Sequence, residues 1–120
     1  MKPYQDARLE GEKLAKQYAE LEKADQVDFY NGLEGYYSVL GHNKKQEAIA
    51  VLIEKNDHKI YVYQLDKGIS QDKAATISRE KGASDIDKIT FGRYQDKPIW
   101  EVKSGNQYYL VDFETGAVIQ

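Results

Sequence analysis

The chain has 120 residues, of which 41% are hydrophobic and 31% are charged, so its composition is that of one globular domain or two very small ones. The net charge is −3 and neither half of the chain is basic, which argues against a nucleic-acid partner. The chain contains no cysteine, which excludes disulfides, thiolate nucleophiles and cysteine-ligated zinc. It also contains no apolar stretch long enough to span a bilayer.

Residues 4–25 are predicted to form an amphipathic helix. Apolar and small residues recur there at spacings of three and four, which places them on one helical face opposite a charged face. The apolar stripe is thin and contains Gly11, which favours a helix laid across a sheet over a helix of a coiled coil. The stripe consists of Tyr4, Ala7, Gly11, Leu14, Ala15, Tyr18 and Leu21.

After this helix the pattern changes to that of β-strands. Short runs rich in valine, isoleucine and tyrosine alternate with turns that contain asparagine, aspartate or glycine. Neighbouring runs joined by short turns are expected to pair as an antiparallel meander. The four strands are predicted at residues 27–30, 35–40, 48–53 and 60–65, with a longer polar turn at Gly41–Lys45.

A second helix is predicted to begin after Ser70, whose hydroxyl suits the N-cap position. Ile69 and Ala74 have the spacing of a hydrophobic staple, and Gly82 is expected to end the helix. The sequence therefore predicts an α+β fold of two tandem units, residues 1–66 and 67–120, each with one helix packed on an antiparallel β-meander. The strands of the second unit are predicted at residues 86–94, 98–103, 107–113 and 117–119.

An internal repeat supports this division. Phe29 and Phe91 lie 62 positions apart, and Tyr37 and Trp100 lie 63 positions apart within similar strands. Trp100 is expected in the core because it is central in its strand and corresponds to Tyr37. Units of about 60 residues bury only a modest share of their surface, so the two units are expected to dock on each other. The following strands are aligned at an offset of 60, with Val51–Glu54 matched to Val111–Glu114.

Five segments carry a resemblance to a known family through their order and spacing. They are Asp28–Gly32, Tyr36–Val39, Gly68–Ser70, Trp100–Val102 and Tyr109–Gly116. Taken together, and over essentially the whole chain, they resemble the YpmB/TseB-like family of cell wall elongation regulators of Gram-positive bacteria. None of these segments is by itself specific for a chemical activity.

The resemblance implies two cystatin-like units related to the PepSY domain. It also implies a single-pass N-terminal membrane anchor, with the remainder of the protein at the extracytoplasmic face of the cell membrane. This chain departs from the family pattern because it lacks the anchor, and residues 4–25 are then expected to be the juxtamembrane helix. The resemblance further implies a role in peptidoglycan synthesis through a penicillin-binding transpeptidase as protein partner. It supplies no catalytic residues.

Two short motifs match those of penicillin-binding enzymes. Ser70–Lys73 has the Ser-x-x-Lys pattern, and Lys103–Gly105 has the Lys-Ser-Gly pattern. Such enzymes need a large α/β scaffold to bring these groups together, so Ser70 is interpreted as a helix cap and Lys103–Gly105 as a hairpin turn. His42 and His58 are expected in polar turns without a third ligand at metal-binding spacing. The sequence predicts no catalytic residue, cofactor or metal.

Aromatic residues are the unusual feature, with ten tyrosines that often occur in pairs or at alternating positions. Tyr61 and Tyr63 alternate with Val62, so both tyrosines are expected on the sheet face away from the helix, with the aliphatic residues buried beneath the helix. They are the candidate partner-binding aromatic face. The alternative is ordinary strand composition and packing between the units.

The leading function is a non-enzymatic binding and regulatory module that docks on a transpeptidase. The alternative is a PepSY-like protease inhibitor or protease-regulating module. Such a module needs a segment that inserts into a cleft, and the turn Gly41–Lys45 is the candidate segment.

Overall fold

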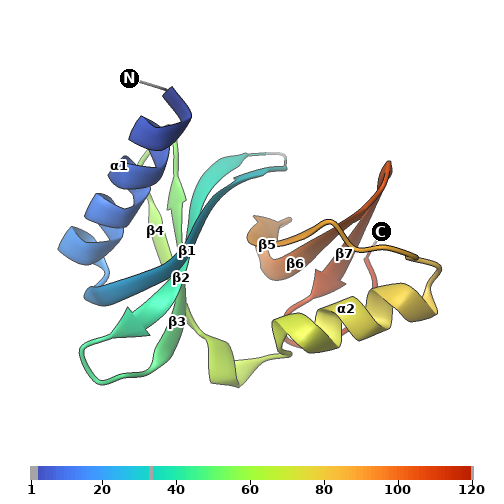
Figure 1. The fold of residues 1–120 in the computed structure, drawn as a ribbon. Coiled ribbons are helices and arrows are strands. Elements are labelled where there is room, and N and C mark those ends of the chain that lie inside the picture. Colours follow the sequence, from blue (N-terminus) through green and yellow to red (C-terminus); the bar gives the residue numbers. More distant parts are fainter. Residues whose placement is uncertain (1–2, 33, 120) are drawn as a thin grey trace. The chain divides into compact units, whose positions relative to one another are not determined.

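The computed structural model describes residues 3–32 and 34–119 and divides the chain into two compact units, Met1–Gln64 and Leu65–Gln120. Each unit contains one α-helix and one antiparallel sheet, so the fold is α+β, as the sequence predicts. Figure 1 shows the elements of the first unit, in which four strands follow one another across the sheet in the order β1-β2-β3-β4. These elements are α1 (Pro3–Tyr18), β1 (Leu21–Asn31), β2 (Gly35–Asn43), β3 (Ala48–Glu54) and β4 (Ile60–Gln64).

Helix α1 ends earlier than the prediction of residues 4–25. The backbone turns at Glu20, which has a positive φ of 59°, and the chain enters β1 at Leu21. Leu21 pairs with Asn43 of β2 and is 3% exposed, so it is buried in the core as a strand residue. The helical spacing of Leu21 was misleading, because a residue that faces the core fits a helix or a strand equally well until its partner strand is known.

Strand β2 is longer than predicted because Gly41 belongs to it. A Cβ atom at Gly41 would lie 2.0 Å from the carbonyl oxygen of Lys23, so glycine allows β1 to approach closely where its pairing register shifts. The prediction that Gly41 begins a turn is therefore wrong. The polar turn contains only residues 44–47, and Asn43 stabilises it by accepting hydrogen bonds from the Lys45 and Glu47 amides at 2.9 and 3.0 Å.

The core of the first unit lies between α1 and one face of its sheet. Helix α1 packs mainly on β1, β2 and β3. Small helical residues let the helix approach the sheet: Ala15 is fully buried, and a Cβ atom at Gly11 would lie 3.2 Å from the Cβ atom of Tyr37. The buried members of this core are Ala15, Ala19, Leu21, Val27, Tyr37, Val39, Ile49, Val51 and Ile53.

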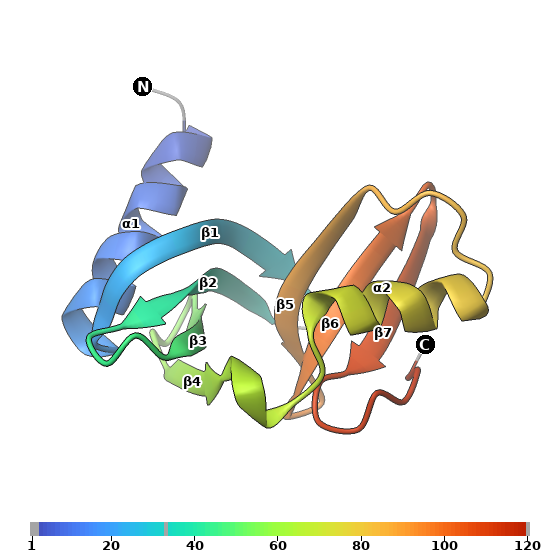
Figure 2. The ribbon, with the colours of Figure 1, turned by 60° about the horizontal axis from the view of Figure 1, so that its bottom comes forward.

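The second unit has three strands in the order β5-β6-β7, with α2 packed on β6 and β7 (Figure 2). The predicted strand at residues 117–119 is reduced to an isolated bridge between Val118 and Val111. The Asp112 carboxylate accepts hydrogen bonds from the Glu114 and Thr115 amides and holds a tight turn that returns the chain beside β7. The elements are η1 (Leu65–Lys67), α2 (Gln71–Glu80), β5 (Lys88–Tyr94), β6 (Lys97–Ser104) and β7 (Gln107–Asp112).

The predicted ends of the second helix are confirmed. Ser70 is the N-cap of α2, and its side chain accepts a hydrogen bond from the Lys73 amide at 3.0 Å. Gly82 follows the C-cap with a positive φ of 114°, a conformation that glycine adopts without steric cost.

An aromatic cluster forms the centre of the second unit. Trp100 is 2% exposed and packs edge-on against Phe91, with ring centroids 4.9 Å apart. Phe113 completes the cluster at 5.2 Å from Phe91. The indole Nε1 of Trp100 donates a hydrogen bond to the Ile69 carbonyl oxygen at 3.0 Å, which ties β6 to the segment before α2. The prediction that Trp100 is buried is confirmed.

The strand pairing corrects part of the expected repeat alignment. Phe29 pairs with Tyr37 in the first sheet, and Phe91 pairs with Trp100 in the second. On the next strand, Ile53 lies opposite Tyr37 and Val111 lies opposite Trp100. The third strands therefore correspond at an offset of 58 and not 60, because the hairpin that precedes the third strand is five residues shorter in the second unit.

The change Trp100→Ala is expected to lower the free energy of unfolding by about 3–5 kcal/mol, the range for a buried aromatic side chain. It leaves a cavity beside Phe91 and removes the donor to the Ile69 carbonyl. Urea unfolding followed by circular dichroism measures the loss. Tyr108→Ala, at a site 55% exposed, is the control and should change stability by less than about 0.5 kcal/mol. A loss below about 1 kcal/mol for Trp100→Ala would contradict a core position.

The change Ser78→Ala is expected to raise the free energy of unfolding by about 1 kcal/mol. Ser78 is fully buried on α2, and its hydroxyl has no hydrogen-bond partner among the described residues. Alanine removes this unsatisfied hydroxyl and is also the better helix former. Thr76→Ala, on the exposed side of the same helix, is the contrast: it also gains helix propensity but loses a hydroxyl that donates to the Asp72 carbonyl at 3.1 Å. A loss of stability in Ser78→Ala alone would mean that the hydroxyl makes a favourable contact.

Candidate functional site

The motifs that resemble penicillin-binding enzymes have local structural roles. The Ser70 hydroxyl caps α2, as described above. Ser104 is the last residue of β6 and is 7% exposed. Gly105 turns the chain with a positive φ of 61° and donates its amide to the Asp87 carboxylate at 2.9 Å. Ser70 is therefore a helix cap, as predicted. The hairpin-turn prediction holds only for Gly105, because Lys103 and Ser104 end strand β6.

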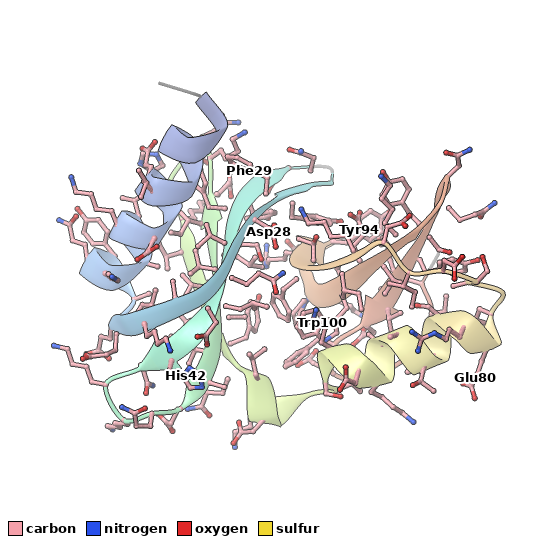
Figure 3. All side chains as sticks on the ribbon, in the orientation of Figure 1. Asp28, Phe29, His42, Glu80, Tyr94 and Trp100 are labelled. Atoms are coloured by element: carbon pink, nitrogen blue, oxygen red, sulfur yellow. The ribbon has the colours of Figure 1, made fainter. Side chains whose placement is uncertain are left out.

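The two histidines lie in different settings. His42 lies within β2 and not in a turn, contrary to the sequence analysis, because β2 continues through Gly41; its position is labelled in Figure 3. Its Nδ1 atom is 3.0 Å from a carboxylate oxygen of Asp25 on β1. His58 lies in the β3–β4 hairpin, as predicted, with a positive φ of 56°. Over residues 3–32 and 34–119, no group of three histidine, aspartate or glutamate residues is placed to hold a metal ion.

Strand β4 presents its tyrosines and its aliphatic residues on opposite faces of the sheet. Tyr61 pairs with Leu52 and Tyr63 pairs with Ala50, whereas Val62 pairs with Val51. Because Val51 belongs to the core beneath α1, Val62 is on the helix side. The register therefore places both tyrosines on the face that α1 does not cover, the orientation that their alternation predicts. Their part in binding stays a prediction.

The expected burial of the aliphatic side of β4 is only partly found. Val62 is 48% exposed, and Ile60 is half-buried. The reason is that α1 packs mainly on the other three strands and leaves this flank of the sheet uncovered. Tyr61 and Tyr63 are half-buried. Strand β4 therefore has partly accessible side chains on both faces.

Tyr61 belongs to a larger aromatic row on the face away from α1. The Tyr61 ring meets the Tyr36 ring edge-on, with centroids 6.3 Å apart, and Tyr30 lies 6.4 Å from Tyr36. Tyr30 and Tyr36 are buried, and the Tyr36 hydroxyl donates a hydrogen bond to Glu34 at 3.0 Å. Tyr61 is thus the half-exposed end of a packed row, held by a rigid neighbour.

An apolar groove of about 190 Å³ lies on the helix side of the same strand. The sequence does not predict this groove, although Leu14 and Tyr18 belong to the predicted apolar stripe of the helix. Tyr18 is 60% exposed, so the last turn of α1 leaves a large aromatic side chain accessible at the groove. The groove is lined by Leu14, Tyr18, Ile53, His58 and Ile60.

A buried carboxyl group marks the hairpin end of β3. Glu54 is 8% exposed, and its burial raises the pKa of the side chain above the usual value. The negative charges of Glu34 and Asp57 act in the same direction, while Lys59 partly opposes them. The pKa of the Tyr37 hydroxyl is also raised, by burial and by the Glu10 carboxylate.

Comparison with known proteins gives consistent results. The model of the family described as "Cell wall elongation regulator TseB-like domain" matches residues 10–54. The chain is 37% identical over 114 residues to a protein of Bacillus subtilis strain 168 described as the probable cell wall elongation regulator TseB. The match covers 88% of this chain and 70% of that protein. The solved structure of the YpmB protein from Bacillus subtilis matches with a TM-score of 0.77 and 32% identity, and the match covers 100% of this chain and 96% of the solved one.

None of the helices in the described part of the chain combines the length and the apolar character that crossing a bilayer requires.

The change Glu54→Gln is expected to raise the melting temperature at neutral pH but not at acidic pH. Because the pKa of Glu54 is raised above 4.5 in the folded chain, the stability that its protonated form contributes is present below that pH. This contribution is lost as the pH rises through the folded-state pKa, whereas glutamine keeps a neutral side chain throughout.

Melting temperatures between about pH 4 and about pH 8 test this expectation, since the range brackets the titration of a perturbed carboxyl group. Glu22→Gln, at an exposed site on β1, controls for the loss of one surface charge. The idea is wrong if Glu54→Gln melts below the unmodified protein at neutral pH, or if the difference between the two does not shrink toward acidic pH.

Proposed function

Because the chain belongs to the family of TseB-like cell wall elongation regulators, we propose that it is a non-enzymatic regulatory module of cell wall synthesis. The observation that carries the proposal is the 37% identity to the Bacillus subtilis regulator over 70% of that protein's length. We also propose that the chain acts at the extracytoplasmic face of the membrane, where the wall is assembled, and that an N-terminal anchor holds it there.

The proposed architecture is a pair of tandem cystatin-like, PepSY-like units, assigned to residues 1–66 and 67–120. Each half of the chain supports this with one helix and one antiparallel sheet. The aromatic pairs Phe29–Tyr37 and Phe91–Trp100 occupy matching places on the first two strands of the two sheets. In this proposal α1 is the juxtamembrane helix.

The proposed partner is a penicillin-binding transpeptidase, which the chain would regulate by docking. Docking proteins concentrate their binding energy in a few aromatic anchors surrounded by polar residues. Tyr61 and Tyr63 are half-buried on the face away from α1, and Tyr61 is supported by Tyr36. Their partly accessible rings support a role as anchors, with little conformational entropy to lose on binding.

Two structural features favour docking over chemistry or inhibition. The Ser70 hydroxyl of the Ser-x-x-Lys motif is engaged as a helix cap, which supports the non-enzymatic interpretation. A protease inhibitor of the PepSY type would need an inserting segment. The segment Gly41–Lys45 is a poor candidate for insertion into a protease cleft, because its first three residues belong to β2.

The double change Tyr61→Ser with Tyr63→Ser is expected to weaken binding to the soluble domain of a penicillin-binding transpeptidase by at least about tenfold, the effect of losing one modest hot spot. Isothermal titration calorimetry measures the affinity, and thermal unfolding measures the stability of the variant. Tyr108→Ser is the matched control, because Tyr108 is an exposed tyrosine on β7 of the other unit.

The melting temperature of the double variant should change by only a few degrees, since both rings are half-exposed. If melting collapses and the folded fraction binds with unchanged affinity, the tyrosines are core residues and not anchors. If the unmodified chain does not bind any transpeptidase domain of its source organism, the proposed partner is wrong.

A further inference from the structure

The outer side of β4 is an open sheet edge. Within the described residues β4 pairs only with β3, so its other side has no strand beside it. The Glu54 amide donates to the Lys59 carbonyl at 2.8 Å, which makes that pair a hydrogen-bonded one. Such pairs alternate along an antiparallel ladder, so Tyr61 and Tyr63 direct their amides and carbonyls to β3. The amides and carbonyls of Ile60, Val62 and Gln64 therefore point outward.

The other sheet edges carry features that discourage pairing, and β4 carries none of them. Strand β1 has two register shifts and four charged side chains. Strand β5 includes Lys88 and Arg93, and the outer side of β7 is partly covered by the bridge between Val118 and Val111. Strand β4 has the sequence Ile-Tyr-Val-Tyr-Gln, without charge, proline, glycine or bulge. Natural proteins protect their edge strands in the ways seen at the other edges, so an unprotected apolar edge points to a pairing site.

The apolar groove lies on the same flank as this open edge. A strand added beside β4 would place every second side chain on the helix side, next to Ile60 and Val62. A side chain at that position would meet the groove between Leu14, Tyr18 and His58. Apart from His58 the lining has no ionisable group other than the Tyr18 hydroxyl, so the groove suits an apolar side chain.

We propose that β4 is a docking edge for an extended segment of a partner protein, which adds to the first sheet as a fifth strand. The outward amides and carbonyls of Ile60, Val62 and Gln64 bind the segment's main chain. The groove between α1 and β4 takes one of its apolar side chains. This is the division of labour in strand addition, where main-chain hydrogen bonds supply affinity and side-chain pockets supply selectivity.

The size of the site favours an extended segment over a second copy of the chain. A stable interface between folded proteins needs about 800 Å² and 20–30 residues on each side. The open edge offers five strand residues and a groove lined by five side chains. An extended peptide uses such a narrow strip fully. The inference goes beyond the proposed function, and its test uses no transpeptidase, so that each can fail without the other.

The test selects ligands from a phage-displayed library of linear peptides of about nine residues, long enough to form one strand. The full chain is the bait, and selected peptides are synthesised and measured by fluorescence polarisation. We expect enriched sequences with apolar residues at alternate positions. Hydrogen exchange should show protection of the Ile60, Val62 and Gln64 amides when a peptide is bound.

Val62→Pro removes one outward amide, and a proline at an edge position spares the ladder with β3. It should weaken peptide binding at least about tenfold, the equivalent of 1.4 kcal/mol. Val62→Thr is the matched control, because it keeps the amide and the branched side chain. It should change the affinity by less than about threefold.

N-methylated peptides test the same contact on the unmodified protein, and so decide the question even if Val62→Pro does not fold. The amides of the peptide form two alternating sets, one that faces β4 and one that faces away. Methylation of the set that faces β4 should abolish binding, and methylation of the other set should leave binding intact. The proposal is overturned if no peptide is enriched, or if binding survives methylation of each of the two sets of amides. It is also overturned if sedimentation shows a dimer of the unmodified chain that Val62→Pro dissociates, because a second copy is then the occupant.

Discussion

A single helix is narrower than a four-stranded sheet, and the arrangement of the first unit follows from this mismatch. An α-helix with its side chains is about 10–12 Å wide, whereas neighbouring strands are about 4.8 Å apart, so one helix covers about two or three strands. Helix α1 packs mainly on β1, β2 and β3. The flank along β4 is left with a half-exposed Val62, an accessible Tyr18 and a groove that Tyr18 and Ile60 help to line. The candidate site is the part of the sheet that the helix does not reach.

The second unit meets the same constraint with a narrower sheet. Its sheet has three strands, and α2 packs mainly on two of them, β6 and β7. The residues that α2 buries are small, namely Ala74, Ala75 and Ser78, whereas the largest buried side chains of this unit are aromatic. Trp100 stacks edge-on with Phe91 and is tied by its indole nitrogen to the chain before α2. The two units therefore share similar pairings on their first two strands. They differ in that the second unit has a dense aromatic core, whereas the first leaves the flank along β4 open.

The regulatory proposal and the docking edge concern the same strand from different sides. Tyr61 and Tyr63 lie on the face away from α1, Ile60 and Val62 lie on the helix side, and the outward main chain lies between them. A five-residue strand can therefore present two kinds of side chain and a row of hydrogen-bonding groups to one partner. Short contacts of this kind suit a regulator whose association is reversible, since small interfaces belong to transient complexes.

Local patterns in the sequence were sufficient to predict the class of the fold and several particular residues. The alternation of residues 60–65 predicts that Tyr61 and Tyr63 share one face, because side chains alternate along a strand, and the lower cost of burying aliphatic residues predicts that this face is away from the helix. Ser70 and Gly82 predict the ends of α2, because capping is a property of the cap residue and its immediate neighbours. Trp100 is buried as its central place in an apolar strand predicts.

Tertiary structure decided what depends on a partner distant in the sequence. Leu21 fits a helix or a strand by its spacing, and pairing with Asn43 makes it a strand residue. Gly41 resembles a turn residue, but the carbonyl of Lys23 occupies the space where a side chain would lie. The groove beside β4 was not predictable, because its lining comes from α1, β3, β4 and a hairpin, and its existence depends on how far the helix extends across the sheet. The direction of side chains along a strand and the capping of a helix depend on residues close together in the sequence. How much of a sheet a helix covers is decided only when the helix packs on the sheet.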